Sequence, residues 1–118
     1  MILIIHLFLD AGNTIVEGIT IANSPYHSLM LRHQDYDQES PTDMRWVKIL
    51  TWRANGDGIN PFANGLVEDC FIRTQDDSTI VNGRGIRRVV YWQDANGSTF
   101  VLTPLGTMMP VAEVQKLA

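Results

Sequence analysis

The sequence has little cysteine, little positive charge and no long uninterrupted apolar run. Its single cysteine, Cys70, excludes an internal disulfide framework and fits a reducing compartment, so we predict a cytoplasmic protein. The 9 Lys and Arg residues stand against 13 Asp and Glu residues, which gives a formal net charge of -4 at pH 7. A chain of this charge has no long-range attraction to nucleic acid or anionic lipid, and we expect neither as a partner.

The N-terminal run MILIIHLFLD is too short to cross a bilayer, which needs ~20 apolar residues. It also lacks the basic start and the small-residue cleavage site of a secretion signal, and His6 interrupts it. These features predict a buried strand and no membrane association.

The length of 118 residues fits a single domain, 1–118, because one hydrophobic core typically holds ~100 to 200 residues. Apolar and β-branched residues gather in segments that we predict as strands, which are 2–9, 14–22, 44–53, 66–74, 86–93 and 98–104. Ser24-Pro25 ahead of apolar residues at helical spacing predicts a helix over 25–33, and a second helix is predicted over 110–117. No internal repeat is evident. The expected fold is therefore α+β, with a mostly antiparallel curved sheet or small open barrel of about six strands and two short helices.

The segment Asp10-Ala11-Gly12-Asn13-Thr14, which follows an apolar strand, resembles the first phosphate loop of sugar-kinase and actin-like ATPases, especially type III pantothenate kinases. The resemblance implies a carboxylate and backbone amides near phosphate and metal. That family closes two domains on the nucleotide, however, whereas this chain has room for one. Gly12 and Asn13 also tolerate positive φ, so we interpret the segment as the turn of a hairpin between 2–9 and 14–22.

That hairpin would place His6 opposite Glu17 on an otherwise apolar face. Burying an unpaired polar group costs roughly 1 to 3 kcal/mol, so the two side chains should satisfy each other. One interpretation is a core or subunit contact. The other is the polar part of a ligand pocket, because a carboxylate also orients an imidazole that acts as a general base. The candidate walls of that pocket are Phe8, Trp46, Trp52 and Tyr91.

A second hairpin is predicted from 86–93 and 98–104, joined by the turn signal Asp94-Ala95-Asn96-Gly97. One of its faces would carry Arg88, Trp92 and Val101, a mixture of residue types that is common at protein interfaces. This face predicts a homo-oligomer or a protein-interaction surface. The arginines between Arg84 and Arg88 offer a third alternative, weak binding of RNA or single-stranded DNA, which the acidic balance of the chain disfavours.

Other chemical motifs are not found in the sequence. Asn55-Gly56-Asp57-Gly58 lacks the later ligands of a calcium loop, and His27 and His33 fall on different faces of the predicted helix. There is no P-loop lysine and no nucleophile elbow, so we assign no metal, no cofactor and no catalytic residue. The leading interpretation is a protein that binds a small molecule beside the first hairpin. The alternative is an interaction or self-assembling module without catalysis.

Overall fold

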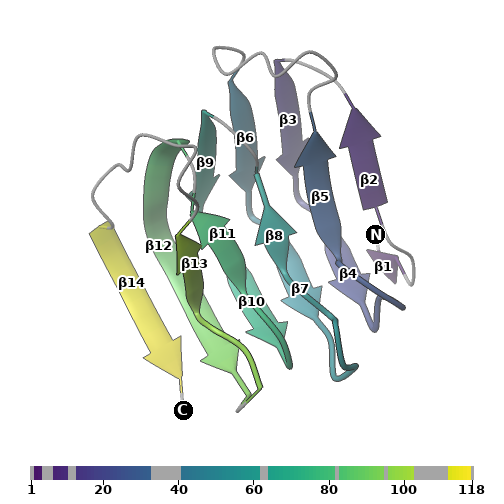
Figure 1. Cartoon of the computed structure of the whole chain (residues 1–118). Coiled ribbons are helices and arrows are strands. Elements are labelled where there is room, and N and C mark those ends of the chain that lie inside the picture. The colour runs from purple at the N-terminus through teal and green to yellow at the C-terminus, as the bar shows by residue number, and fades with distance from the viewer. Residues whose placement is uncertain are drawn as a thin grey trace.

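The computed structural model describes residues 2–3, 7–10, 13–32, 41–61, 64–81, 83–94, 96–102 and 112–117. All regular structure among these residues is β-strand, and every pairing between strands is parallel. The strands form two facing layers, a larger curled sheet and a smaller sheet (Figure 1).

The larger sheet contains nine strands, which are β1 (Ile2–Leu3), β3 (Thr14–Glu17), β4 (Thr20–Ala22), β6 (Thr42–Arg45), β7 (Lys48–Leu50), β9 (Gly65–Glu68), β10 (Phe71–Thr74), β12 (Gly83–Gln93) and β14 (Ala112–Leu117). The smaller sheet contains five strands, which are β2 (Leu7–Asp10), β5 (Leu29–Arg32), β8 (Ile59–Asn60), β11 (Thr79–Val81) and β13 (Phe100–Leu102). Neighbours in each sheet are never consecutive along the chain, which is the arrangement of a parallel β-solenoid.

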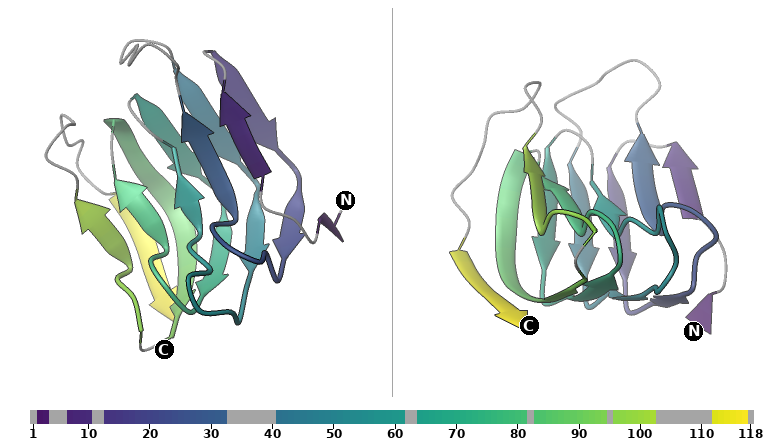
Figure 2. Two further views of the ribbon diagram at one scale, coloured as in Figure 1. Left: turned by 45° about the vertical axis from the view of Figure 1, so that its right-hand side comes forward. Right: turned by 60° about the horizontal axis from the view of Figure 1, so that its bottom comes forward.

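The chain winds around the core in successive turns, each of which we call a coil. A coil passes up one strand of the smaller sheet, crosses to the larger sheet, and runs down two strands there before it returns (Figures 1 and 2). Strands β5, β6 and β7 make one such coil, and β8, β9 and β10 make the next. In the following coil the single long strand β12 pairs with both β9 and β10.

In the larger sheet each coil bends at a residue with left-handed backbone conformation, which lies between two strands or, in the last case, within β12. Gly18, Trp46, Asp69 and Arg88 occupy this bend in successive coils, with φ of 68°, 51°, 54° and 48°. A single residue in this conformation changes the direction of the chain without folding it back on itself. The next strand therefore pairs with another coil instead of with its predecessor.

The core lies between the two layers and consists of inward-pointing residues stacked in register. Ile21, Ile49, Ile72 and Tyr91 are aligned across β4, β7, β10 and β12, and all four are fully buried. Each fully buried apolar side chain of this size contributes roughly 1.5 to 3 kcal/mol relative to exposure. Stacking of coils thus buries an apolar column that no single coil could cover.

The expected α+β, mostly antiparallel fold is wrong. Strand β2 pairs with β5, and β3 pairs with β6, so the strands on either side of Asp10 to Asn13 lie in different sheets and form no hairpin. The second predicted hairpin fails in the same way, because β12 belongs to the larger sheet and β13 to the smaller one. At both predicted hairpin turns the chain passes from one sheet to the other, so it does not fold back to pair with the preceding strand.

The two predicted helices are also wrong. Leu29–Arg32 is strand β5, and Ala112–Leu117 is strand β14. Both segments are short, and their apolar residues fit the spacing of a helix as well as that of a strand. Hydrogen bonding to neighbouring coils makes them extended.

Candidate functional site

The connections that return from the larger sheet to the smaller one lie side by side at the bottom of Figure 1. They are residues 23–28, 51–58, 75–78 and 94–99, with residue 95 outside the described part. In the right-hand view of Figure 2 this end of the molecule is turned towards the viewer. Loops gathered at one end of a rigid scaffold are common places for binding and catalytic residues.

Backbone hydrogen bonds between successive connections hold them in register just before the strands of the smaller sheet begin. The backbone N–H of Ser28 donates to the carbonyl of Asp57, and that of Gly58 donates to the carbonyl of Asp77, each over 2.8 Å. His27, Asp57 and Asp77 each stand two residues before the aligned strand positions of three successive coils. Neighbouring parallel strands lie about 4.8 Å apart, so these ionisable side chains form a closely spaced column.

Asp57 is the central member of this column and is partly buried. Its Oδ2 lies 2.7 Å from Nδ1 of His27, and the two side chains are 18% and 22% exposed. Burial raises the pKa of Asp57 above its usual range, the imidazole of His27 lowers it, and the carboxylates of Asp76 and Asp77 raise it again. The net effect is a raised pKa, which favours the protonated acid.

Asp76 and Asp77 are held rigidly by their surroundings. Asp77 donates its backbone N–H to Oδ1 of Asp76 over 2.9 Å, and Oδ1 of Asp77 accepts from the backbone N–H of Ser98 over 2.8 Å. Gln93 fixes the backbone by donating from Nε2 to the carbonyl of Asp76 over 2.9 Å. These hydrogen bonds fix the position of both carboxylates near Asp57.

Close packing against Gly97 completes the support of this loop. A Cβ atom added at Gly97 would stand 2.3 Å from the carbonyl carbon of Asp76 and 2.5 Å from the backbone nitrogen of Asp77. Only glycine therefore fits in the next coil beneath the Asp76–Asp77 peptide.

Two exposed tryptophans lie on either side of the buried Arg73 of β10. Trp52 follows β7, and Trp92 is in β12. The guanidinium carbon of Arg73 lies 4.9 Å from the ring centroid of Trp52 and 5.8 Å from that of Trp92. Arg73 is 6% exposed and donates to the carbonyl of Thr51 and to Asp94, over 2.7 and 2.9 Å. The indoles remain 53% and 45% exposed, so this end of the solenoid presents flat aromatic surfaces.

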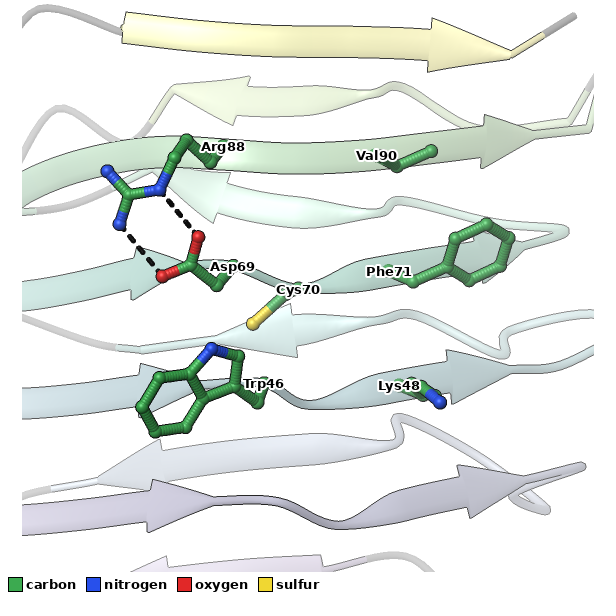
Figure 3. Close-up of a pocket in the computed structure, with 7 residues that line it drawn as sticks. All are labelled: Trp46, Lys48, Asp69, Cys70, Phe71, Arg88 and Val90. Carbon is green, nitrogen blue, oxygen red and sulfur yellow. Dashed lines mark hydrogen bonds and ion pairs between the residues drawn. The ribbon is translucent and has the colours of Figure 1, made fainter.

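A separate hollow of about 380 Å³ lies on the outer face of the larger sheet (Figure 3), and its lining residues are Trp46, Lys48, Asp69, Cys70, Phe71, Arg88 and Val90. Arg88 forms a two-fold contact with Asp69, of 2.5 Å from Nε and 2.8 Å from the terminal nitrogen (Figure 3). Hydrogen bonding by Arg88 holds the pKa of Asp69 below its usual range. Desolvation raises the pKa of Cys70 to about 12, so its thiol stays protonated at neutral pH.

Of the residues proposed for a pocket beside the first hairpin, the four whose side chains the structure describes lie in different places. Glu17 is exposed at the end of β3, whereas Tyr91 is fully buried in the core. Trp46 lines the outer hollow, and Trp52 stacks near Arg73. His6 and the side chain of Phe8 lie outside the described residues.

Two of the residues proposed for an interface, Arg88 and Trp92, are exposed and also contact other residues of the chain. Arg88 contacts Glu68 and Asp69, and Trp92 packs near Arg73. The side chain of Val101, in β13, lies outside the described part. In the arginine-rich segment, Arg84 also pairs with Asp43, which lies two coils away, so two of its cations meet carboxylates of other coils.

Sequence reasoning missed the column of His27, Asp57 and Asp77, and it did not consider Asp76. A signal was present, because Asp57-Gly58-Ile59 and Asp77-Ser78-Thr79 both place an aspartate two residues before a strand. Only knowledge of the coil register shows that these two positions are neighbours in space.

Within the described residues, no group of three or more His, Cys, Asp or Glu side chains has an arrangement that could hold a metal ion. The same part of the chain has no helix long and apolar enough to cross a membrane. No protein-family model, no curated protein and no solved structure matches this chain. Functional inference therefore rests on the geometry of the carboxylates and the residues around them.

Proposed function

We propose that this protein hydrolyses glycosidic bonds in neutral carbohydrate chains, with Asp57 as general acid and the Asp76–Asp77 pair as the source of the general base. The observation that carries the proposal is the grouping of three carboxyl groups, in which Asp57 and Asp77 stand at aligned positions of neighbouring coils and Asp76 lies next to Asp77. Burial and the neighbouring carboxylates also raise the pKa of Asp57. Glycoside hydrolysis needs one protonated acid and one ionised carboxylate in the same site. Two neighbouring carboxyl groups can be protonated and ionised at the same pH when their surroundings give them different pKa values.

The proposed reaction follows from the state of each group. Asp57 gives its proton to the glycosidic oxygen as the bond from this oxygen to the anomeric carbon breaks. A carboxylate of the Asp76–Asp77 pair takes a proton from the water that bonds to the anomeric carbon. Backbone N–H groups donate to a carboxylate oxygen of both Asp76 and Asp77, which holds the proposed base in place.

The substrate class follows from the aromatic surfaces and the charge of the chain. Exposed indoles such as Trp52 and Trp92 offer flat apolar faces that match the C–H faces of sugar rings. Trp52 belongs to the connection that holds Asp57, and Trp92 precedes Gln93, which binds the Asp76 carbonyl. A net charge of -4 disfavours an acidic polysaccharide.

The direct test is to measure the release of reducing ends from a panel of neutral polysaccharides, including glucans, xylan and mannan. Wild-type protein is compared with Asp57→Asn, Asp76→Asn and Asp77→Asn, and with Glu17→Gln as a matched control at an exposed carboxylate elsewhere. Loss of the general acid is expected to lower kcat by ~100-fold or more, because acid–base catalysis contributes roughly 10² to 10⁴. Thermal unfolding checks that each variant is folded. Absence of hydrolysis by the wild type, or full activity in Asp57→Asn, contradicts the proposal.

A second candidate function is the binding of a small anionic aromatic molecule in the outer hollow. Its volume of about 380 Å³ falls within the roughly 300 to 1,000 Å³ of ligand sites, and Trp46 and Lys48 offer an indole and a cation there. The test is a fluorescence titration with anilinonaphthalene sulfonate. We expect Trp46→Ala to weaken binding and Trp52→Ala, at the other aromatic site, to leave it unchanged. Equal binding by both variants would exclude this site.

A further inference from the structure

His27 lies against Asp57 from the neighbouring coil and is itself fixed in place. Its ring packs edge-on against Tyr26, with centroids 4.0 Å apart and planes at 80°. Its backbone carbonyl accepts a hydrogen bond from Oγ of Ser24 over 3.0 Å. The imidazole is thus held at the one point where its Nδ1 meets Oδ2 of Asp57.

We propose that His27 is a positioning residue for Asp57, which it orients through the Nδ1–Oδ2 contact. This inference rests on the proposed function and adds a role for a residue outside the carboxylate set. Because Oδ2 of Asp57 contacts His27, the proposal assigns the proton transfer to Oδ1. Orientation of a reacting group matters because a displacement of about 1 Å can cost on the order of 100-fold in rate.

The electrostatic part of the role follows from the groups that face Asp57. These are the imidazole of His27 from the preceding coil and the carboxylates of Asp76 and Asp77 from the following one. Burial, and after it the two aspartates, raise the pKa of Asp57, whereas the imidazole of His27 lowers it. If the contact with the imidazole outweighs the burial that its ring provides, its removal raises this pKa further.

The experiment follows the carboxyl carbon of Asp57 by NMR during a pH titration of the full chain. Three variants are compared with the wild type, namely His27→Ala, His27→Asn and Ser24→Ala. Asparagine retains a side-chain N–H donor near the position of Nδ1 but carries no charge, so it separates hydrogen bonding from charge. Ser24→Ala perturbs the same connection and leaves the imidazole present.

We expect the titration midpoint of Asp57 to rise in His27→Asn and to rise further in His27→Ala. An unchanged or lowered midpoint in His27→Ala overturns the proposal. So does a rise in Ser24→Ala as large as that in His27→Ala, because the effect would then come from the shape of the loop.

Activity gives the second measurement. If the wild type hydrolyses a polysaccharide, His27→Ala should lower kcat by roughly tenfold or more. It should also move the alkaline limb of the pH–rate profile to higher pH. His27→Asn should restore part of both properties. An unaltered profile in an active His27→Ala enzyme contradicts the positioning role. If the wild type hydrolyses nothing but the Asp57 midpoint still shifts as expected, the glycosidase proposal fails and the pairing of His27 with Asp57 stands.

Discussion

The hydroxyl of Tyr91 lies 2.9 Å from Oγ1 of Thr79, and this contact joins the larger sheet to the smaller one inside the core. Both residues are at most 1% exposed. We predict that Tyr91→Phe destabilises the protein by about 1 to 3 kcal/mol, because Thr79 then loses a buried hydrogen-bond partner.

The double variant Tyr91→Phe/Thr79→Val should recover much of that loss, since removing both partners of a buried hydrogen bond can be nearly neutral. Urea unfolding of the wild type, the two single variants and the double variant measures the coupling. Strictly additive losses would show that the contact contributes no coupling energy.

Glycine is needed at Gly18 and Gly97 for different reasons. Gly18 has φ of 68° and nothing within 4 Å of an added Cβ, so Gly18→Ala should cost about 1 to 2 kcal/mol from backbone strain alone. At Gly97 an added Cβ would collide with the Asp76–Asp77 peptide, so Gly97→Ala should displace that peptide and reduce any hydrolytic activity.

Chemical unfolding and the polysaccharide assay together test this difference. Gly18→Ala is the matched control, because it changes the backbone at a bend away from the carboxylates. If Gly97→Ala leaves both stability and activity at wild-type levels, the close packing beneath Asp76 has no functional consequence.

Burial of Cys70 predicts both low reactivity and a pH dependence of stability. The folded-state pKa of Cys70 is raised from 9.0 to about 12, so the native thiol keeps a proton that the unfolded chain releases. Its contribution to stability is complete below about pH 9 and is lost as the pH rises towards 12.

Two measurements check this prediction. A thiol reagent at pH 8 should modify Cys70 slowly in the native protein and quickly in urea. The fall in the free energy of unfolding between pH 9 and 12 should be smaller in Cys70→Ala than in the wild type. Rapid native modification would show that the thiol is accessible.

The proposed acid Asp57 should be a source of instability. Because burial and the neighbouring carboxylates raise its pKa in the folded state, its contribution to stability is present below the unfolded pKa and is lost as the pH rises through the folded value. Asp57→Asn should therefore be more stable than the wild type at pH 7 while it loses activity, a trade-off common at functional sites. The measurement is the urea midpoint at pH 7 and at pH 3, where the difference should shrink.

Several strands could be located from the sequence, but their partners could not. The predicted segment 14–22 contains β3 and β4, whereas 66–74 covers β10 and most of β9, and 86–93 covers all but the first three residues of β12. Alternation of side chains identifies extended backbone, yet it is the same for a strand that pairs with its neighbour and for one that pairs with the next coil.

The coil repeat was hidden because its length varies. Ile21, Ile49, Ile72 and Tyr91 align in space, but the intervals between them along the chain are unequal. A search for a fixed period therefore fails, although each coil presents an apolar residue at the same point. For the same reason the column of His27, Asp57 and Asp77 was not visible as a cluster.

The sequence by itself determined the apolar segments that become strands, the negative net charge of the chain and the presence of a single cysteine. These properties depend on local composition and on periodicity along the chain. Only the tertiary structure decided that the strands are parallel, and that His27 and two aspartates from later coils stand beside one another. The physical reason is that pairing between coils is a contact between distant residues, governed by how a whole apolar column is buried.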